Sequence, residues 1–401
     1  MKKVNALVLG MMLLAVMMFS AVVATGCGGG GAQPSEVIDN AIANNANTKS
    51  GHVDYNVKLD VQGDATALGA EFKGLLPLTL GISGGADFDN NDASNPKAQG
   101  NVAITGLDTI LQSIASSQGS SDASTTMGLN LIGSMLSDIK FVTLDQKLYL
   151  NLGGTWYQTD ASSASGLGGL GGLGGLSGLG SGLSSGLSGT GTSTRASTVD
   201  TACLENAFKD KSRFGSSNIL SNIQDAGTES INGADARHFK ADINLDGFLT
   251  QTANAMRDCG QAEAAGSIEA GKSQLTSMFK TKSVELWVDN NNNFVQVNLN
   301  LELDPAAIAN LAGSLGGTST DSTSTDSGAA AAASALKSIT FTVNLKMSNL
   351  NQTMTITKPQ GNILNLDDLL GGGLGSSLGG LGGTGTSGTS TGTSTSSIYS
   401  P

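Results

Sequence analysis

The stretch HVDYNVKLDV, from His52 to Val61, decides the fold class because apolar and polar residues alternate along its whole length. The same two-residue period recurs at 239–245, 295–303 and 339–347. Successive side chains of a strand point to opposite faces of the sheet. The period therefore predicts half-buried antiparallel strands, each with one apolar and one solvated face.

Shorter strands surround these runs. The segments 141–144, 147–152 and 156–158 are separated by two-residue turns, Asp145-Gln146 and Gly153-Gly154, as in tight hairpins. A further hairpin is predicted between 284–288 and 294–303, because the five residues that join them are one Asp and four Asn.

Helical spacing of apolar residues is less frequent. Ser35 is a candidate cap for a helix with Val37, Ile38, Ala41 and Ile42 on one face. Other helices are predicted at about 201–209, 247–256, 261–279, 107–114 and 127–136. The predicted fold is α+β: a large curved antiparallel sheet, an incomplete barrel, with helices on its concave apolar face.

The N-terminus has the pattern of a secretory signal. Lys2 and Lys3 precede an apolar run at 6–23, and small residues then lead to Cys27. The alternative is a membrane span, since the run is long enough to cross a bilayer. The residues Ala24-Thr25-Gly26-Cys27 resemble the bacterial lipobox, which implies a signal peptide at 1–26 and a diacylated Cys27. Two acyl chains anchor a protein stably, and the glycines of 27–34 would form a tether.

Composition sets the remaining boundaries. Segments 162–198, 313–334 and 371–401 are rich in Gly, Ser, Thr, Leu or Ala and offer little to bury. We therefore predict an N-terminal half at 35–161, a Gly/Leu/Ser-rich insertion at 162–198, and a C-terminal half at 199–370. The second half contains a mobile insertion at 313–334, and a disordered tail follows at 371–401. The net charge of −12 argues against nucleic acid and against a polybasic grip on anionic lipid.

Two cysteines remain if Cys27 is acylated. Outside the cytosol, Cys203 and Cys259 are candidates for a disulfide that closes about 57 residues, and two separate buried thiols are the alternative. A metal site is not expected, because neither cysteine lies in a CxxC motif and the chain has two His.

Four phrases in order resemble one family. They are KSGHVDYNVKLDV, KLYLNLGGTWYQTD, INGADARHFKADINL and KSVELWVDNNNNFVQVNLNLEL. Their order after a lipobox and a short helix is similar to envelope lipoproteins of the LolA-like superfamily, especially the LppX/LprG type. That resemblance implies an apolar cavity between sheet and helices that holds the acyl chains of a lipid or lipoprotein. The insertion at 162–198 departs from the family pattern.

The resemblance implies a lipid or amphiphile ligand, a membrane contact through the N-terminal lipid, and a place on the extracytoplasmic face of a membrane. Another envelope protein could be a partner, and no cofactor is expected. The candidate cavity residues are Val57, Leu59, Phe239, Ile243, Val297, Leu299, Phe341 and Val343. A filled core would instead make the domain a surface-displayed structural, interaction or sensor unit.

Catalytic motifs are not visible. His52 and His238 are expected at the surface or at strand edges, without a nucleophile motif nearby, so an enzyme is not predicted. The run DFDNNDASN, residues 87–95, favours a polar hairpin turn over a weak calcium loop. Trp156 and Trp287 are expected to anchor the sheet to helices, with a position at the cavity rim as the alternative.

Overall fold

The computed structural model describes residues 32–64, 76–92, 94–110, 112, 133–134, 137–160, 201–208, 210–307 and 335–366. Cys27, the signal peptide, most of the tether, both insertions and the tail lie outside these residues, as do most of the helix candidates at 107–114 and 127–136. Expectations about those segments and the domain boundaries remain predictions.

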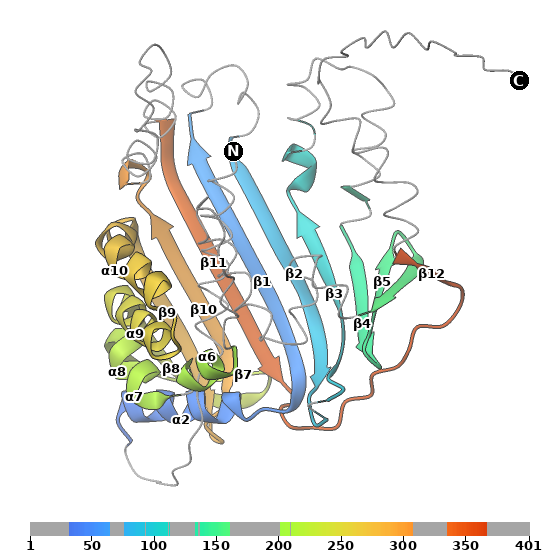
Figure 1. Cartoon of the computed structure of the whole chain (residues 1–401), viewed down its shortest axis with the longest axis horizontal. Helices are drawn as coiled ribbons and strands as arrows, with labels where there is room; N and C mark the ends of the chain where they lie inside the picture. Colours follow the sequence, from blue (N-terminus) through green and yellow to red (C-terminus); the bar gives the residue numbers. More distant parts are fainter. Residues whose placement is uncertain are drawn as a thin grey trace, which may run out of the picture.

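Twelve strands form one open sheet in the order β12-β6-β5-β4-β3-β2-β1-β11-β10-β9-β8-β7 (Figure 1). The first six are β1 Ser50–Gly63, β2 Leu78–Asp89, β3 Lys97–Thr105, β4 Ile139–Leu144, β5 Lys147–Leu152 and β6 Thr155–Asp160. The others are β7 Leu220–Ile231, β8 Ala234–Ile243, β9 Phe279–Asp289, β10 Phe294–Leu303, β11 Leu336–Ser348 and β12 Ile363–Asn365. Neighbouring strands are antiparallel except for β12 and β6, which pair in parallel.

The predicted strands are all present, which confirms the α+β class and the large antiparallel sheet. Asp145 and Gln146 have φ of 54° and 59° in the two-residue β4–β5 turn. Positive φ at both central residues gives this turn the twist that suits a hairpin. The β1–β11 ladder joins strands from opposite ends of the described chain, so the two predicted halves contribute to one sheet.

The sequence analysis does not predict strands β2, β3, β7 and β12. β2 reads LTLGISGGADFD and contains residues of low strand propensity, Gly and Asp, at several positions. β7 is an edge strand with most of its residues exposed, so it lacks an apolar stripe. Both are held in the sheet by ladders with neighbours that do show the alternation, β1 and β8.

Six helices are described: α2 Pro34–Ala46, α6 Thr201–Phe208, α7 Lys211–Phe214, α8 Ser216–Ile219, α9 Leu245–Asp258 and α10 Ala262–Ser277. The prediction of Ser35 as the cap of the first helix is wrong. The capping position is Gln33, which makes no side-chain cap bond, and Pro34 occupies the first turn. Proline suits that position because its missing N–H would have no helical partner there.

The helices pack on the apolar face of the sheet. Val37, Ile38 and Ala41 of α2 join a buried cluster with side chains of β8, β9, β10 and β11. Helices α9 and α10 pack against each other, and α6 packs against α9. Among the described elements these helices gather over the β7–β10 end of the sheet, and β1–β6 extend beyond them (Figure 1).

A disulfide joins Cys203 of α6 to Cys259, directly after α9, with a Cα–Cα distance of 5.7 Å. It links two helices of the layer that covers the β7–β10 end. Cys203 precedes Cys259 by 56 positions, so the bond closes a long loop of chain.

Candidate functional site

The eight candidate cavity residues lie on the apolar face of neighbouring strands. Six are buried in one cluster, Val57 is partly buried against it, and Leu59 lies beside Phe341 in the β1–β11 ladder. The buried six are Phe239, Ile243, Val297, Leu299, Phe341 and Val343. The structure therefore brings the set together, and their role as the lining of a cavity remains a prediction.

The apolar face continues past this cluster. On β1, Val53, Tyr55, Val57, Leu59 and Val61 face the same side and are only partly buried. Their β2 partners include Ile82, Leu80 and Leu78, opposite Val57, Leu59 and Val61. We call these eight residues of β1 and β2 the apolar strip.

Beyond the apolar strip, a second buried cluster covers β2 to β5. Its members are Ala86, Ala98, Val102, Ile139, Phe141, Leu148, Leu150 and Leu366. Val53, Tyr55 and Ile82 of the strip pack against it, while Val57 packs against the first cluster. The strip is thus the connection between two apolar clusters on one continuous face.

Among the described helices, those with substantial sheet contacts are α2, α8 and α10, and their partners are β7, β9 and β10. The apolar strip lies outside that contact area. Its side chains are partly exposed although they follow the pattern of core positions. Partly exposed apolar side chains that adjoin a core mark surfaces where apolar ligands or partners bind.

Tyr55 brings one polar atom to this strip. Its hydroxyl donates a hydrogen bond to the backbone oxygen of Asn101, at 2.9 Å. Burial raises the pKa of Tyr55 to about 12, so the ring stays neutral at physiological pH. The strip therefore carries no charged side chain.

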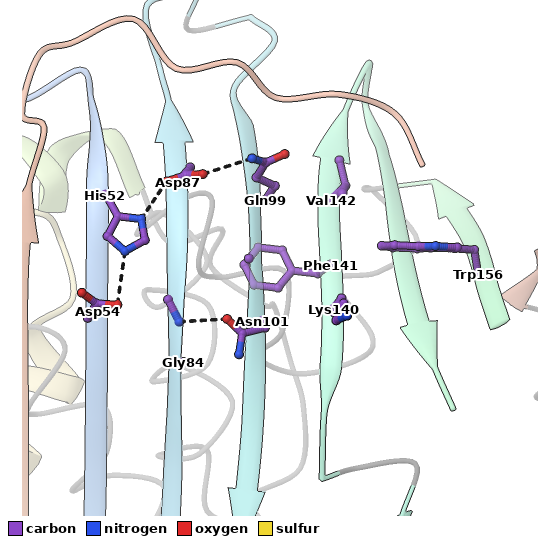
Figure 2. A pocket seen from close by; sticks show the side chains of 12 residues that line it. His52, Asp54, Gly84, Asp87, Gln99, Asn101, Lys140, Phe141, Val142 and Trp156 are labelled. Atoms are coloured by element: carbon purple, nitrogen blue, oxygen red, sulfur yellow. Dashed lines mark hydrogen bonds and ion pairs between the residues drawn. The ribbon is translucent and has the colours of Figure 1, made fainter. Parts of the chain in front are cut away.

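The opposite face is polar on β1 to β3, where it contains a shallow depression that β4 and β6 also line (Figure 2). His52 of β1 lies between two carboxylates, with Nδ1 2.7 Å from Asp87 and Nε2 3.2 Å from Asp54. Gln99 Nε2 donates to the other oxygen of Asp87 at 3.0 Å. His52 is therefore a strand residue at the surface, as expected, but it is also held in a polar chain across three strands.

These contacts move two pKa values in opposite directions. Partial burial alone lowers the pKa of His52, but hydrogen bonds and charges from Asp87 and Asp54 outweigh it, and the net pKa lies above 6.5. Partial burial likewise raises the pKa of Asp87, but hydrogen bonds from Gln99 and His52 bring it below 3.8. Both shifts favour the charged pair.

We expect the imidazole of His52 to titrate above pH 6.5 and to lose much of that shift in Asp87→Asn. Stability from the raised His52 pKa is present below pH 6.5 and is lost as pH rises through the folded value. Stability from the lowered Asp87 pKa is present above pH 3.8 and is lost as pH falls through the folded value. The pair therefore stabilises most between these limits. Proton NMR of the two histidine rings measures this, with His52→Gln to assign the signal.

An His52 pKa at or below its ordinary value, or one unchanged in Asp87→Asn, would contradict the pairing. His238 is an internal control, because its signal should not move in that variant.

His238 is not at the surface, so that prediction is wrong. Its side chain is buried, with 4% exposure, and its ring stacks on Trp287 with centroids 4.2 Å apart. Nδ1 lies 2.8 Å from Glu229 and Nε2 lies 3.1 Å from Glu285. The indole N–H of Trp287 also donates to Glu229, at 2.9 Å. The four side chains tie edge strand β7 to β8 and β9.

The prediction that Trp287 anchors the sheet to a helix is also wrong. It pairs with His238 across the β8–β9 ladder, and its neighbours Leu286 and Val288 face the helix-side cluster. Trp287 therefore faces away from the helices, and it does not lie at the rim of the apolar face. Its position in the polar phase of the alternation could have indicated this.

Trp156 lies in the wall of the polar depression, not at a contact between sheet and helix. The predicted hairpin turn is confirmed between Asp89, which ends β2, and Lys97, which begins β3, whereas residues 87–89 of the predicted turn belong to β2. Across the described ranges, no group of three or more His, Cys, Asp or Glu is placed to hold a metal ion. None of the helices in that part of the chain is long and apolar enough to cross a membrane.

No protein-family model and no curated protein matches the chain. Among solved structures, the lipoprotein LppX of Mycobacterium tuberculosis is 12% identical, with 81% of this chain and 98% of that one covered and a TM-score of 0.32. LprF of Mycobacterium bovis is 11% identical, with 83% and 100% covered and a TM-score of 0.32. A DUF1329 family protein of Desulfovibrio piger is 8% identical, with 84% and 97% covered and a TM-score of 0.18.

LppX is of the type that the four sequence phrases resemble.

Proposed function

We propose that the protein is a membrane-anchored envelope lipoprotein that binds the acyl chains of a lipid or other amphiphile, for carriage or presentation. The observation that supports this is the apolar strip, which continues the face of a packed core but is only partly buried. The acyl chains would lie along the strip, between the two apolar clusters. The proposal assigns no catalytic step.

The driving force is the removal of apolar surface from water. Each CH₂ group that becomes buried contributes about 0.8 kcal/mol relative to water. A ligand that leaves a membrane gains less, because its chains were already in an apolar medium. The protein would therefore compete with the bilayer through the fit of chains to the strip and would exchange lipid with it.

The proposed anchor is the acylated Cys27, followed by the glycine tether. It would hold the domain close to the surface from which an acyl chain is taken. The Cys203–Cys259 disulfide supports a location outside the cytosol, because such bonds persist in oxidising compartments.

We expect Val57→Asp and Leu59→Asp to remove most of the lipid that copurifies with the chain. Each places a carboxylate in the middle of the apolar strip, where a bound acyl chain could not solvate it. The matched control is Asn56→Asp, which puts the same group on the polar face of the same strand. The measurement is organic extraction of full-length protein from an envelope-containing host, followed by mass spectrometry of the extract.

Extraction separates the two kinds of lipid, since a covalent anchor on Cys27 stays with the protein while a bound ligand is released. Equal lipid in all three variants would contradict binding at the strip. Binding would also be contradicted if wild-type protein held no extractable lipid and took none up from vesicles.

A second function is favoured by a different observation. Phe239 and Val297 are fully buried in a packed cluster, as in a domain whose core is filled. A protein with a filled core and no ligand would be a surface-displayed interaction or sensor unit. Protein free of extractable lipid would support this function.

A further inference from the structure

The depression on the polar face has no part in the proposed lipid binding. It has a volume of about 660 Å³, and the backbone of Gly84, Gly85 and Gly100 contributes to its lining. The side chains of Val53 and Tyr55 point to the apolar face, whereas His52 and Asp54 point to this one. The depression and the apolar strip therefore lie on opposite sides of the same strands.

Gly85 lines the depression between His52, Asp54 and Asn101 without a side chain of its own. It pairs with Asp54, so a side chain there would project from the polar face. A Cβ at Gly85 would lie 3.0 Å from Asp54 Oδ1 and 3.3 Å from the ring of His52. A larger side chain would occupy the hollow between these groups and Asn101.

Five side chains around the hollow have unused hydrogen-bonding atoms. Within the described residues, no partner is found for Asp54 Oδ2, Gln99 Oε1, Asn101 Nδ2, Lys140 Nζ or Trp156 Nε1. Two of these atoms accept hydrogen bonds and three donate them. A ligand that fits must offer both donors and acceptors at several points.

The charges of the site are nearly balanced. Asp54 and Asp87 carry two negative charges, Lys140 carries one positive charge, and His52 adds a second positive charge when its imidazole is protonated. A bound anion would meet the two carboxylates, and a bound cation would meet Lys140. The balance favours a neutral ligand.

The last feature of the depression is an aromatic side chain in its wall. Trp156 of β6 closes the side of the hollow beyond β4, and Figure 2 shows its ring edge-on, extending from β6 toward β4. An indole face beside polar side chains suits a molecule that has both C–H faces and hydroxyl groups.

We propose that this depression is a binding site for a neutral saccharide, with a sugar ring against Trp156 and its hydroxyl groups on Asp54, Gln99, Asn101 and Lys140. Hydroxyl groups donate and accept, as the unused atoms require, and a neutral sugar disturbs no charge pair. The protein would hold a glycan on one face of the sheet, independently of what the other face binds.

The test is isothermal titration of the full-length chain with a panel of neutral oligosaccharides of hexose and pentose units. We expect saturable binding to at least one member of the panel. Trp156→Ala should weaken it about tenfold, the loss that corresponds to about 1.4 kcal/mol. Gly85→Leu should abolish it by filling the hollow, and Asn101→Ala should weaken it.

The matched control is Asn56→Ala, an exposed side chain on the polar face of β1 outside the depression, which should bind as wild type does. Circular dichroism shows whether Gly85→Leu folds, and Trp156→Ala with Asn101→Ala decide the test if it does not. No binding to any sugar, or equal binding by these variants, would overturn the proposal. Binding of inorganic phosphate or Ca²⁺ in place of the sugars would also overturn it.

Discussion

Phe239→Ala is expected to lower the free energy of unfolding by about 3–5 kcal/mol, the range for truncating a fully buried aromatic residue. Phe239 has no exposed surface and lies in the cluster that joins α2 to β8, β9, β10 and β11. The guanidinium of Arg237 lies 5.0 Å from the centroid of its ring. The substitution removes apolar contacts and leaves a cavity at the point where helix and sheet meet. Urea denaturation followed by circular dichroism gives the change.

The matched control is Lys240→Ala, one position along the same strand but on the opposite face. Its ammonium lies 3.5 Å from Glu285, and its side chain is 53% exposed. Exposed ion pairs contribute little, so we expect a change of less than about 1 kcal/mol. A Phe239→Ala variant as stable as this control would mean that the cluster is not a packed core.

Replacing both Cys203 and Cys259 by Ser is expected to lower stability by roughly 4 kcal/mol. A disulfide restricts the unfolded chain, and the restriction grows with the length of the closed loop. The bond spans 56 positions and links α6 to the end of α9. Its loss should loosen α6 first, because α6 otherwise contacts mainly α7 and α9. Thermal unfolding and limited proteolysis of the double variant measure both effects.

Reduction of the wild-type protein should reproduce the loss, and the same reductant should leave the double variant unchanged. Equal melting temperatures for oxidised protein and double variant would contradict the expected contribution. Cleavage that starts in the sheet rather than near α6 would contradict the expected order of loosening.

Most of the sheet could be predicted because its central strands are amphipathic. A strand such as β1 needs one apolar face wherever its partners are, so the alternation of Val53, Tyr55 and Val57 with polar residues is visible before folding. The Asn-rich β9–β10 turn is likewise local, since its side chains bond their own backbone, as Asp289 does with Asn291 and Asn293.

The missed strands and side-chain roles depend on distant neighbours. β2 carries Gly81, Gly84 and Gly85 and follows the sheet because β1 and β3 pair with it on both sides. His238 appears as one polar residue in an alternating strand. It is buried only because Trp287 and Glu229, from two other strands, close around it. Both partners lie on other strands, so the sequence pattern around His238 does not reveal them.

The sequence by itself determined the α+β class, the predicted strands and the faces on which the eight candidate residues lie, because strand periodicity is a local property of the chain. The strand order, the coverage of one end of the sheet by helices and the depression around Gly85 were decided only by the tertiary structure. Each of these depends on which strands become neighbours, since groups as distant as His52, Gln99 and Lys140 meet only after the ladders form. Those long-range pairings are stabilised by contacts among many strands of the sheet, so no single segment of the sequence specifies them.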